Sequence, residues 1–368
     1  MTLSPIFSPA DYSRLRGWAD DDAAGAYAAF RRSALYIATA PKPYRSGSLG
    51  VPFDALADAF EEARGVAAPQ SLHAFFERHF QPCLVSSAPA EAGFVTGFYE
   101  PELPASRVET RHYRFPLYAR PDDLVDLDRS NRPTGLDPSF AFGRRTPEGI
   151  IEYFDRREIE SGALAGRAPV IAWLADKVDL FFVHVQGAAR LLLDGGEVLR
   201  VTYAAKSGHP FTGPGGVLAA RGEIPRDEVT MQSIRAWFRA NPKRTDEILW
   251  RNRSFIFFRE TAVGDIDAGP IAAAKVQLTA GRSLAVDRLL HTFGTPFFID
   301  APSLTAFDGK PFARLMIAQD TGSAILGPAR GDIFTGSGAA AGEIAGVIRH
   351  QAGFYALVPR RLLGGKAA

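Results

Sequence analysis

Short apolar segments separated by glycine and proline turns fill the last quarter of the chain, and this pattern constrains the fold more than any other feature. From Ile271 onward the segments read AKVQLTA, PFFIDAP, RLMIAQD, DIFTG and GFYALVP. Short runs of aliphatic and aromatic residues bounded by turn formers are typical of the strands of a β-barrel or β-sandwich. We therefore predict that this part of the chain consists of short strands.

The N-terminal part of the chain has a helical pattern instead. Residues 20–38 place Ala, Phe and Leu at helical spacing behind three aspartates, whose charge suits the positive end of a helix dipole. Residues 53–65 repeat the pattern and end at a glycine, and residues 71–80 begin with Ser71, a good helix cap. Helices followed by many strands predict an α+β chain that is mainly β.

The middle of the chain is predicted to be largely β as well. Strand patterns are present in FVTGFYEPEL, APVIAWL, VDLFFVHVQG and SFIFFRE, and Asp194-Gly195-Gly196 between two apolar runs is a hairpin signal. An amphipathic helix is expected over residues 226–241, and residues 121–149, dense in Asp, Pro, Gly and Arg, are expected to form loops. A chain of 368 residues with this content is expected to form two domains.

Charge and cysteine content exclude several kinds of function. The chain has 42 Lys and Arg against 41 Asp and Glu, so its overall charge does not favour nucleic acid or an anionic membrane. Cys83 is the only cysteine, which excludes an internal disulfide and a cysteine-rich metal site. No HExxH, Walker, Rossmann or GxSxG motif is present. We therefore expect neither a metal nor a cofactor.

Two aspartates stand out between Leu315 and Gly338, where the chain reads LMIAQDTGSAILGPARGDIFTGSG. Asp320 and Asp332 lie among glycines directly after an apolar strand pattern. Asp and Gly are common turn formers, and turn chemistry alone explains most such clusters. The alternative is an acid/base site at which glycine allows a ligand to approach the backbone. The stretch by itself leaves both interpretations open.

Other polar residues lie among aromatic ones, a combination that suits carbohydrate, because sugars offer flat apolar faces and many hydroxyl groups. Each of these residues taken alone is more often structural. The candidates are Tyr99, Glu100, Gln186, Lys206 and His209.

Taken together, seven segments resemble the membrane-bound lytic transglycosylase A family and occur in the same order. They read TGFYEPEL, VDLFFVHVQGAARL, YAAKSGHPF, MQSIRAWF, RNRSFIFFRE, GRSLAVDR and AQDTGSAI with RGDIFTGSG. The resemblance runs from about Phe94 to Pro359 and leaves only the N-terminal helices weakly matched. Enzymes of this family cleave the β-1,4 bond between N-acetylmuramic acid and N-acetylglucosamine in peptidoglycan and leave 1,6-anhydromuramic acid ends.

The resemblance also implies an architecture. It is a double-psi β-barrel whose sequence is interrupted by a second, smaller β-barrel, with a glycan groove between the two. The main domain is expected to be discontinuous and to comprise residues 1–104 and 261–368. Residues 105–260 are expected to form the inserted barrel.

The resemblance makes Asp332 the catalytic acid and gives Asp320 a supporting role. Gly331 stands where well-known members carry an aromatic residue, Phe98 stands where Tyr is common, and the loop between the aspartates is one residue longer. One carboxylate suffices for this reaction, because the C6 hydroxyl of muramic acid is a nucleophile tethered to the same ring. The acid must start protonated, so its pKa is expected to be raised. The expected substrate-binding residues are Thr96, Tyr99, Glu100, Gln186, Lys206, His209 and Ser323.

By the same resemblance the protein is expected in the periplasm or cell envelope of a Gram-negative bacterium. It is expected to act as a monomer on peptidoglycan glycan strands, with outer-membrane association in its native form, although no signal peptide and no membrane-spanning run is visible. Two alternatives remain. An inverting glycan hydrolase would need a second carboxylate, for which Glu100 and Asp287 are candidates. A peptidoglycan-binding module without activity would use the aspartates only for turn geometry.

Overall fold

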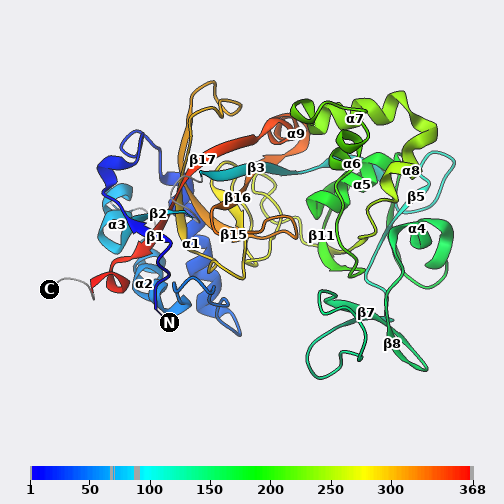
Figure 1. Cartoon of the computed structure of the whole chain (residues 1–368), viewed down its shortest axis with the longest axis horizontal. Helices are drawn as coiled ribbons and strands as arrows, with labels where there is room; N and C mark the ends of the chain where they lie inside the picture. Colours follow the sequence, from blue (N-terminus) through cyan, green and yellow to red (C-terminus); the bar gives the residue numbers. More distant parts are fainter. Residues whose placement is uncertain (1, 67–68, 70, 87–91, 365–368) are drawn as a thin grey trace. The chain divides into compact units, whose positions relative to one another are not determined.

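The computed structural model describes residues 2–66, 69, 71–86 and 92–364. The chain divides into two compact units, one formed by Met1–Tyr99 with Asp265–Ala368 and the other by Glu100–Gly264. These limits differ by five and four residues from the domain limits expected after residues 104 and 260. The first unit is therefore discontinuous in sequence, and the second is inserted into it (Figure 1).

Three helices cover one side of the sheet in the first unit, as the sequence predicts. They are α1 (Ala24–Thr39), α2 (Ala57–Gly65) and α3 (Leu72–His79). The Ser71 hydroxyl accepts a hydrogen bond from the Ala74 N–H and caps α3, as the sequence predicts. Helix α1 has no side-chain cap at its N-cap residue Ala23, but the Asp22 carboxylate accepts a hydrogen bond from the N–H of its first residue, Ala24. Helix α1 packs on strand β15 (Phe312–Asp320) through a core of aromatic and aliphatic side chains. That core includes Phe30, Phe60, Phe75, Phe76, Phe80, Phe298, Leu315 and Ile317.

The sheet of the first unit has eight strands in the order β1-β2-β17-β14-β15-β13-β16-β3. Strand β3 also pairs with β17, so the six strands from β17 to β3 close into a ring. Its interior is filled by apolar side chains from every side, among them Val286, Phe297, Met316 and Phe354. The strands are β1 (Phe7–Pro9), β2 (Phe80–Val85), β3 (Gly93–Glu100), β13 (Ser283–Val286), β14 (Pro296–Ala301), β16 (Arg330–Ser337) and β17 (Arg349–Pro359), and helix α9 (Gly338–Val347) follows β16.

One strand expected in this unit is absent. Residues 274–280 form an irregular segment with a single bridge between Ile271 and Gln277. Lys275 has a positive φ of 62°, which breaks the extended backbone in the middle of the run. The alternation of apolar residues there reflects the burial of Ala274, Val276 and Leu278 without strand pairing.

The second unit contains a six-stranded sheet in the order β12-β11-β10-β4-β9-β5 and a separate three-stranded sheet β6-β7-β8. Strands β10 and β11 pair in antiparallel fashion, which confirms the hairpin predicted at Asp194-Gly195-Gly196. Residues 121–149 were expected to be loop-rich, but they contain β6 and β7 and the first residue of β8, which are three to five residues long and too short to show a period of two. The strands are β4 (Glu102–Ser106), β5 (Phe115–Tyr118), β6 (Leu124–Asp126), β7 (Phe142–Thr146), β8 (Gly149–Ile151), β9 (Val170–Leu174), β10 (Ala188–Leu193), β11 (Val198–Lys206) and β12 (Ile256–Thr261).

The segment VDLFFVHVQG, predicted to be a strand, is a helix. Helix α5 (Lys177–Gln186) begins after Asp176, whose carboxylate accepts a hydrogen bond from the Asp179 N–H, and ends at Gly187, which has a left-handed φ of 76°. Five consecutive residues, 180–184, are buried, so the sequence shows neither helical nor strand periodicity there. The other helices of this unit are α4 (Arg156–Glu158), α6 (Pro214–Ala220), α7 (Met231–Ala240) and α8 (Thr245–Leu249), and α7 confirms the predicted amphipathic helix.

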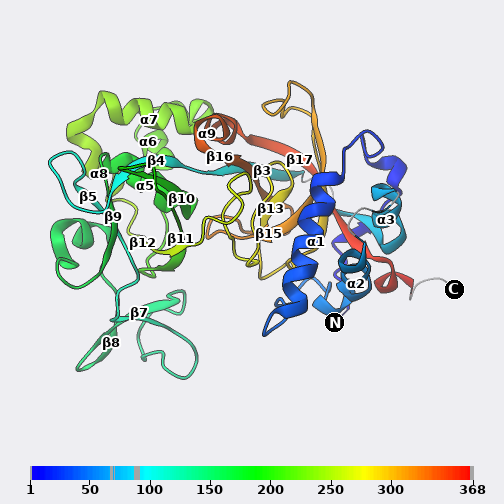
Figure 2. The same cartoon turned by 180° about the vertical axis from the view of Figure 1, so that it is seen from behind.

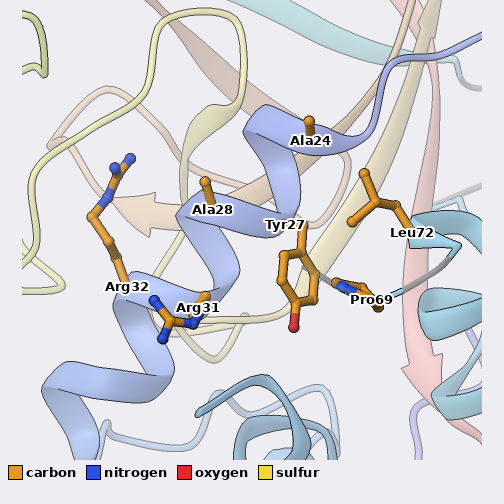
Figure 3. Close-up of a pocket in the computed structure, with 7 residues that line it drawn as sticks. All are labelled: Ala24, Tyr27, Ala28, Arg31, Arg32, Pro69 and Leu72. Carbon is orange, nitrogen blue, oxygen red and sulfur yellow. The ribbon is translucent and has the colours of Figure 1, made fainter. Parts of the chain in front are cut away.

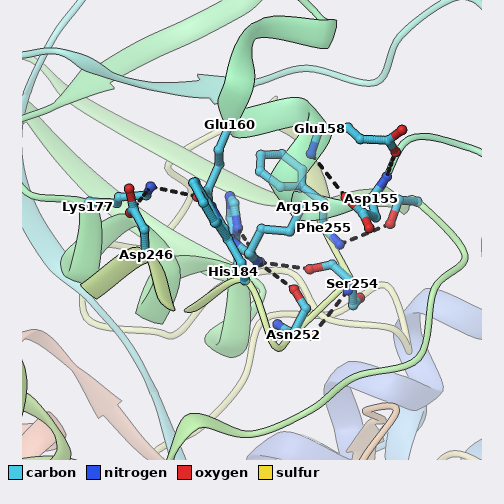
Figure 4. Close-up of polar contacts among 12 residues, drawn as sticks. Asp155, Arg156, Glu158, Glu160, Lys177, His184, Asp246, Asn252, Ser254 and Phe255 are labelled. Carbon is cyan, nitrogen blue, oxygen red and sulfur yellow. Dashed lines mark hydrogen bonds and ion pairs between the residues drawn. The ribbon is translucent and has the colours of Figure 1, made fainter. Parts of the chain in front are cut away.

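A buried arginine anchors α5 within the second unit (Figure 4). The Arg156 guanidinium donates to the backbone oxygens of Ser254 (2.8 Å) and Asn252 (3.2 Å) and pairs with the Glu160 carboxylate at 3.0 Å. One of its nitrogens lies 3.1 Å from Nδ1 of His184 on α5. Burial, followed by the adjacent Arg156 charge, lowers the pKa of His184 well below its usual range, so this ring is neutral and accepts at Nδ1. A buried cation with these partners fixes the helix to the segment that precedes β12.

Candidate active site

The two aspartates lie on β15 and β16, the two strands that flank β13. Asp320 is the last residue of β15, and Asp332 lies inside β16, so only the segment 321–329 between them is a turn. Strand β13 lies between these strands, all three of which are labelled in Figure 2, and its residue Ala285 is in register with Asp332 on β16 and, next to an irregularity in the pairing, with Asp320 on β15. Ala285 therefore lies between the two aspartates. Their carboxyl groups are close enough for the charge of Asp332 to raise the pKa of Asp320.

Asp320 is an unusually weak acid. Its Oδ1 accepts a hydrogen bond from the Ala273 N–H at 3.1 Å. Burial raises the pKa of this carboxyl from 3.8 to about 6, and the negative charge of Asp332 contributes in the same direction, against the backbone N–H groups of Thr321 and Ala273. Two carboxyl groups that interact in this way hold a proton closer to neutral pH than either would alone.

Asp332 is held by a chain of hydrogen bonds. The Thr96 hydroxyl on β3 donates to Asp332 Oδ1, and Arg330 Nη2 donates to the Thr96 oxygen at 2.7 Å. Burial raises the pKa of Asp332, while the Thr96 hydrogen bond and the Arg330 charge act against that rise. Arg330 was not among the predicted site residues, although it lies two positions before Asp332 on the same strand and hence on the same face.

Two further predicted residues belong to the first unit. Tyr99 is only 7% exposed, and its ring packs against α9, where a Cβ atom at Gly342 would lie 2.8 Å from it. Ser323 is exposed in the turn that joins the two aspartates. The first unit thus gathers Thr96, Asp320 and Asp332, with Ser323 in the connecting turn and Tyr99 largely covered.

The remaining predicted residues belong to the second unit. Glu100 is completely buried, and its carboxylate pairs with the guanidinium groups of Arg190 (3.0 Å) and Arg200 (2.8 Å). His209 is 1% exposed, and its Nε2 donates a hydrogen bond to the backbone oxygen of Tyr153 at 2.7 Å. The geometry of both residues favours a structural role.

Gln186 and Lys206 are the partly exposed members of this group. Gln186 was expected in a strand but is the last residue of α5, and Lys206 is the last residue of β11. Burial lowers the pKa of the Lys206 ammonium, which means that part of its hydration is lost in the folded protein. These two side chains remain able to meet a ligand.

A cavity of about 350 Å³ lies along α1 (Figure 3). None of the predicted site residues contributes to it, so its position says nothing about the aspartates. Its lining comprises Ala24, Tyr27, Ala28, Arg31, Arg32, Pro69 and Leu72. Within the described part of the chain, no group of three His, Cys, Asp or Glu residues is arranged to hold a metal ion, and no helix is both long and apolar enough to cross a bilayer.

Family models match both units. The MltA specific insert domain matches residues 94–259, and the 3D domain matches residues 282–358. The membrane-bound lytic murein transglycosylase A of Escherichia coli strain K12 is 30% identical over 260 residues, which cover 69% of this chain and 62% of that protein. The matched region thus spans less than two thirds of this curated relative.

Solved structures are similar over nearly the whole chain. A membrane-bound lytic murein transglycosylase from Agrobacterium tumefaciens is 52% identical with a TM-score of 0.91, covering 98% of this chain and 99% of the other. MltA from Neisseria gonorrhoeae is 32% identical with a TM-score of 0.77, covering 96% and 92%. Escherichia coli MltA with bound chitohexaose is 24% identical with a TM-score of 0.69, covering 97% and 95%, and this likeness concerns the fold.

Proposed function

The chain belongs to the membrane-bound lytic murein transglycosylase A family, and we propose that it is itself a lytic transglycosylase of peptidoglycan. It would cleave the β-1,4 bond between N-acetylmuramic acid and N-acetylglucosamine and leave 1,6-anhydromuramic acid ends. The observation that supports this most is the pair of aspartates on either side of Ala285, both with raised pKa. A carboxyl group that keeps its proton near neutral pH is what protonation of a glycosidic oxygen requires.

In the proposed mechanism Asp332 acts first as acid and then as base. Its proton passes to the glycosidic oxygen while the bond from that oxygen to C1 of muramic acid breaks. The C6 hydroxyl of the same sugar then attacks C1, and its proton returns to Asp332. No water is consumed, and the intramolecular attack avoids the entropic cost of bringing in a second molecule.

Three neighbours support Asp332 in this role. Thr96 fixes the orientation of its carboxyl group, Arg330 holds Thr96, and Asp320 is a second carboxyl group close enough for the two charges to interact. Burial of Asp332 itself favours its protonated form. Asp320 is the alternative proton donor, because its pKa of about 6 is itself suited to an acid at neutral pH. The two assignments differ in which carboxyl group transfers the proton, not in the reaction.

We further propose that the first unit is a double-psi β-barrel and that residues 105–260 form a smaller barrel that takes part in glycan binding. The closed ring of six strands in the first unit and the match of residues 94–259 to an insert domain support this. Gln186, Lys206 and Ser323 would contact sugar. Escherichia coli MltA binds chitohexaose, an oligosaccharide related to the glycan strand.

The names of the relatives support a place in the cell envelope, since they are called membrane-bound murein transglycosylases. We propose that the protein acts in the periplasm as a monomer on glycan strands, with outer-membrane association in its native form.

Mass spectrometry of the muropeptides released from purified sacculi tests the proposed function. Anhydro ends support a lytic transglycosylase, whereas reducing ends would indicate an inverting hydrolase. That hydrolase would need Glu100 or Asp287, whose oxygens are already occupied by two arginines and by two backbone N–H groups, respectively. Binding to sacculi without any released product would indicate a binding module.

A further inference from the structure

The loop that joins the two aspartates crosses the end of strand β13. Residues 321–329 connect β15 to β16, and β13 lies between them, parallel to β15 and antiparallel to β16. The end of β15, the end of β13 and the start of β16 therefore lie at one edge of the sheet. The loop has to pass over the residue that follows β13, which is Asp287.

Asp287 is bound to this loop by its side chain. Its Oδ2 accepts a hydrogen bond from the Gly327 N–H at 3.0 Å, and its Oδ1 accepts one from the Leu289 N–H at 3.0 Å. The residue is 8% exposed, so the carboxylate is used within the protein. Hydrogen bonds from N–H groups to an ionised carboxylate are about twice as strong as neutral ones.

His291 is bound to the next residue of the loop. Its Nε2 lies 2.7 Å from the Pro328 carbonyl oxygen, which can only accept, so Nε2 carries the proton. Burial lowers the pKa of His291 to about 4, and the ring is therefore neutral at physiological pH. The ring meets Phe297 edge-on, with 5.0 Å between the ring centroids. The backbone N–H of His291 donates to the backbone oxygen of Asp287 at 2.8 Å, so Asp287 and His291 belong to one hydrogen-bonded turn.

We propose that Asp287 and His291 are positioning residues, which together hold the N–H group of Gly327 and the carbonyl group of Pro328 and thereby set the geometry of the Asp320–Asp332 pair. The proposal rests on the proposed function for its catalytic meaning. Asp287 fixes the N–H group of Gly327, and His291 fixes the carbonyl oxygen of Pro328. The two-residue segment is therefore held at both of its ends.

The held residues are close in sequence to the groups that bind Asp332. Arg330 follows Pro328 by two positions and donates to Thr96, whose hydroxyl donates to Asp332. The Ala329 oxygen accepts a hydrogen bond from the Phe94 N–H at 2.9 Å, which ties the end of the loop to β3. A shift of the loop would therefore move Arg330 and Thr96 and alter how Asp332 is held.

Three substitutions test the proposal. His291→Phe keeps an aromatic ring but cannot donate to the Pro328 oxygen, whereas His291→Gln places an N–H donor near the position of Nε2. Thr292→Val is the matched control, because Thr292 lies in the same turn, is 1% exposed, and donates its hydroxyl proton to the Val51 oxygen, outside the loop.

With the full-length protein on sacculi, His291→Phe is expected to lower kcat roughly 10–10²-fold, since small misplacement of catalytic groups has effects of this size. KM should stay within about 3-fold of wild type, because the sugar contacts are intact. His291→Gln should recover most of the rate, and Thr292→Val should retain it at equal folded concentration. The pH–rate profile of His291→Phe should shift relative to both, since a merely structural loss would leave the aspartate pair unchanged.

Two outcomes separate this inference from the proposed function. If the wild type releases anhydro products but His291→Phe and Thr292→Val lose activity alike, with unshifted pH profiles, the inference is wrong and the function stands. If the wild type releases no product, the proposed function is wrong, and the rate of amide hydrogen exchange then tests whether His291 holds the loop. His291→Phe should then speed amide exchange at Gly327 well beyond Thr292→Val, and equal exchange in the two variants would overturn it.

Discussion

Arg330, Thr96 and Asp332 form a short chain of hydrogen bonds, and Arg330 also donates to the backbone oxygen of Gly331. The guanidinium fixes the threonine oxygen, so the threonine proton is left for the carboxylate. This arrangement holds the Asp332 carboxyl group in a fixed orientation. Asp320 instead accepts from the backbone N–H groups of Ala273 and Thr321, and within the described residues no side chain donates to it. The two aspartates are thus chemically distinct despite their similar sequence surroundings.

Asp332→Asn is expected to preserve the fold and to lower the rate of anhydro-product release by about 10²–10⁴-fold or more. Asparagine retains the size of the side chain and can still accept from Thr96, but it cannot donate an acidic proton, and loss of general acid–base catalysis has this magnitude. Asp320→Asn should cost less, because Asp320 is proposed to influence the acid without transferring its proton. Muropeptide release by both variants at equal folded concentration measures the difference.

The reverse order of effects would change the assignment. Near-normal anhydro product from Asp332→Asn, together with loss of activity in Asp320→Asn, would make Asp320 the proton donor.

Asp320→Asn is also expected to stabilise the protein at neutral pH. The folded-state pKa of Asp320 is raised from 3.8 to about 6, so its favourable contribution to stability is complete below pH 3.8 and is lost as the pH rises through 6. Two pKa units correspond to about 3 kcal/mol, which is the upper limit of the effect. Urea unfolding of wild type and variant should therefore show the larger advantage of the variant at pH 7.5 and little or none at pH 3.5. An equal difference at both pH values would contradict the raised pKa.

Residues 178–187 show what sequence patterns can and cannot predict about individual elements. The N-terminal helices were predictable from their helical period. The hairpin was predictable from its Asp-Gly-Gly turn, and most C-terminal strands were predictable as short apolar runs bounded by glycine and proline. Helix α5 was not, because it is buried over five consecutive residues and its aromatic and β-branched composition resembles a strand. Its cap at Asp176 and its final glycine were the available signals.

The candidate site was predictable only in part. The pair Asp320 and Asp332 is visible in the sequence, but their common register with Ala285 depends on strand order, which no local pattern encodes. For the same reason Arg330 was missed. Glu100 and His209 were chosen for their chemistry, yet the Glu100 carboxylate and the His209 Nε2 are engaged inside the second unit.

Helix α9 requires a glycine where it meets Tyr99. A Cβ atom at Gly342 would lie 2.8 Å from the Tyr99 ring, so Gly342→Ala is expected to destabilise the protein by about 1–3 kcal/mol through overpacking. Gly216→Ala in α6 is the control, since no atom lies within 4 Å of the added methyl group. That change should stabilise by up to about 1 kcal/mol through helix propensity. Equilibrium denaturation of both variants measures the contrast, and effects of the same sign would refute the packing argument.

The second unit has hydrophobic cores of its own, which suggests that it can fold alone. One core joins Leu191, Val201 and Phe258, and another joins Phe181 and Trp237. We expect residues 100–264 produced separately to unfold in urea in one cooperative transition. Three of the four tryptophans of the chain, Trp173, Trp237 and Trp250, belong to this segment, so fluorescence and circular dichroism should report the same midpoint. A gradual, non-cooperative loss of signal would show that the unit depends on the rest of the chain.

Strand β3 leaves the ribosome long before the strands that flank it. Thr96 pairs with Arg349, 253 positions later (349 − 96), and its hydroxyl meets Asp332. The inserted unit can therefore complete its own folding before β16 and β17, the two strands that flank β3, have been made. The ring closes only after β17 has been made. Chain topology of this kind slows folding, because distant segments must find each other late. It also means that a chain truncated before Arg349 lacks the strand that pairs with Thr96, so the group that orients the Asp332 carboxyl loses one of its supports.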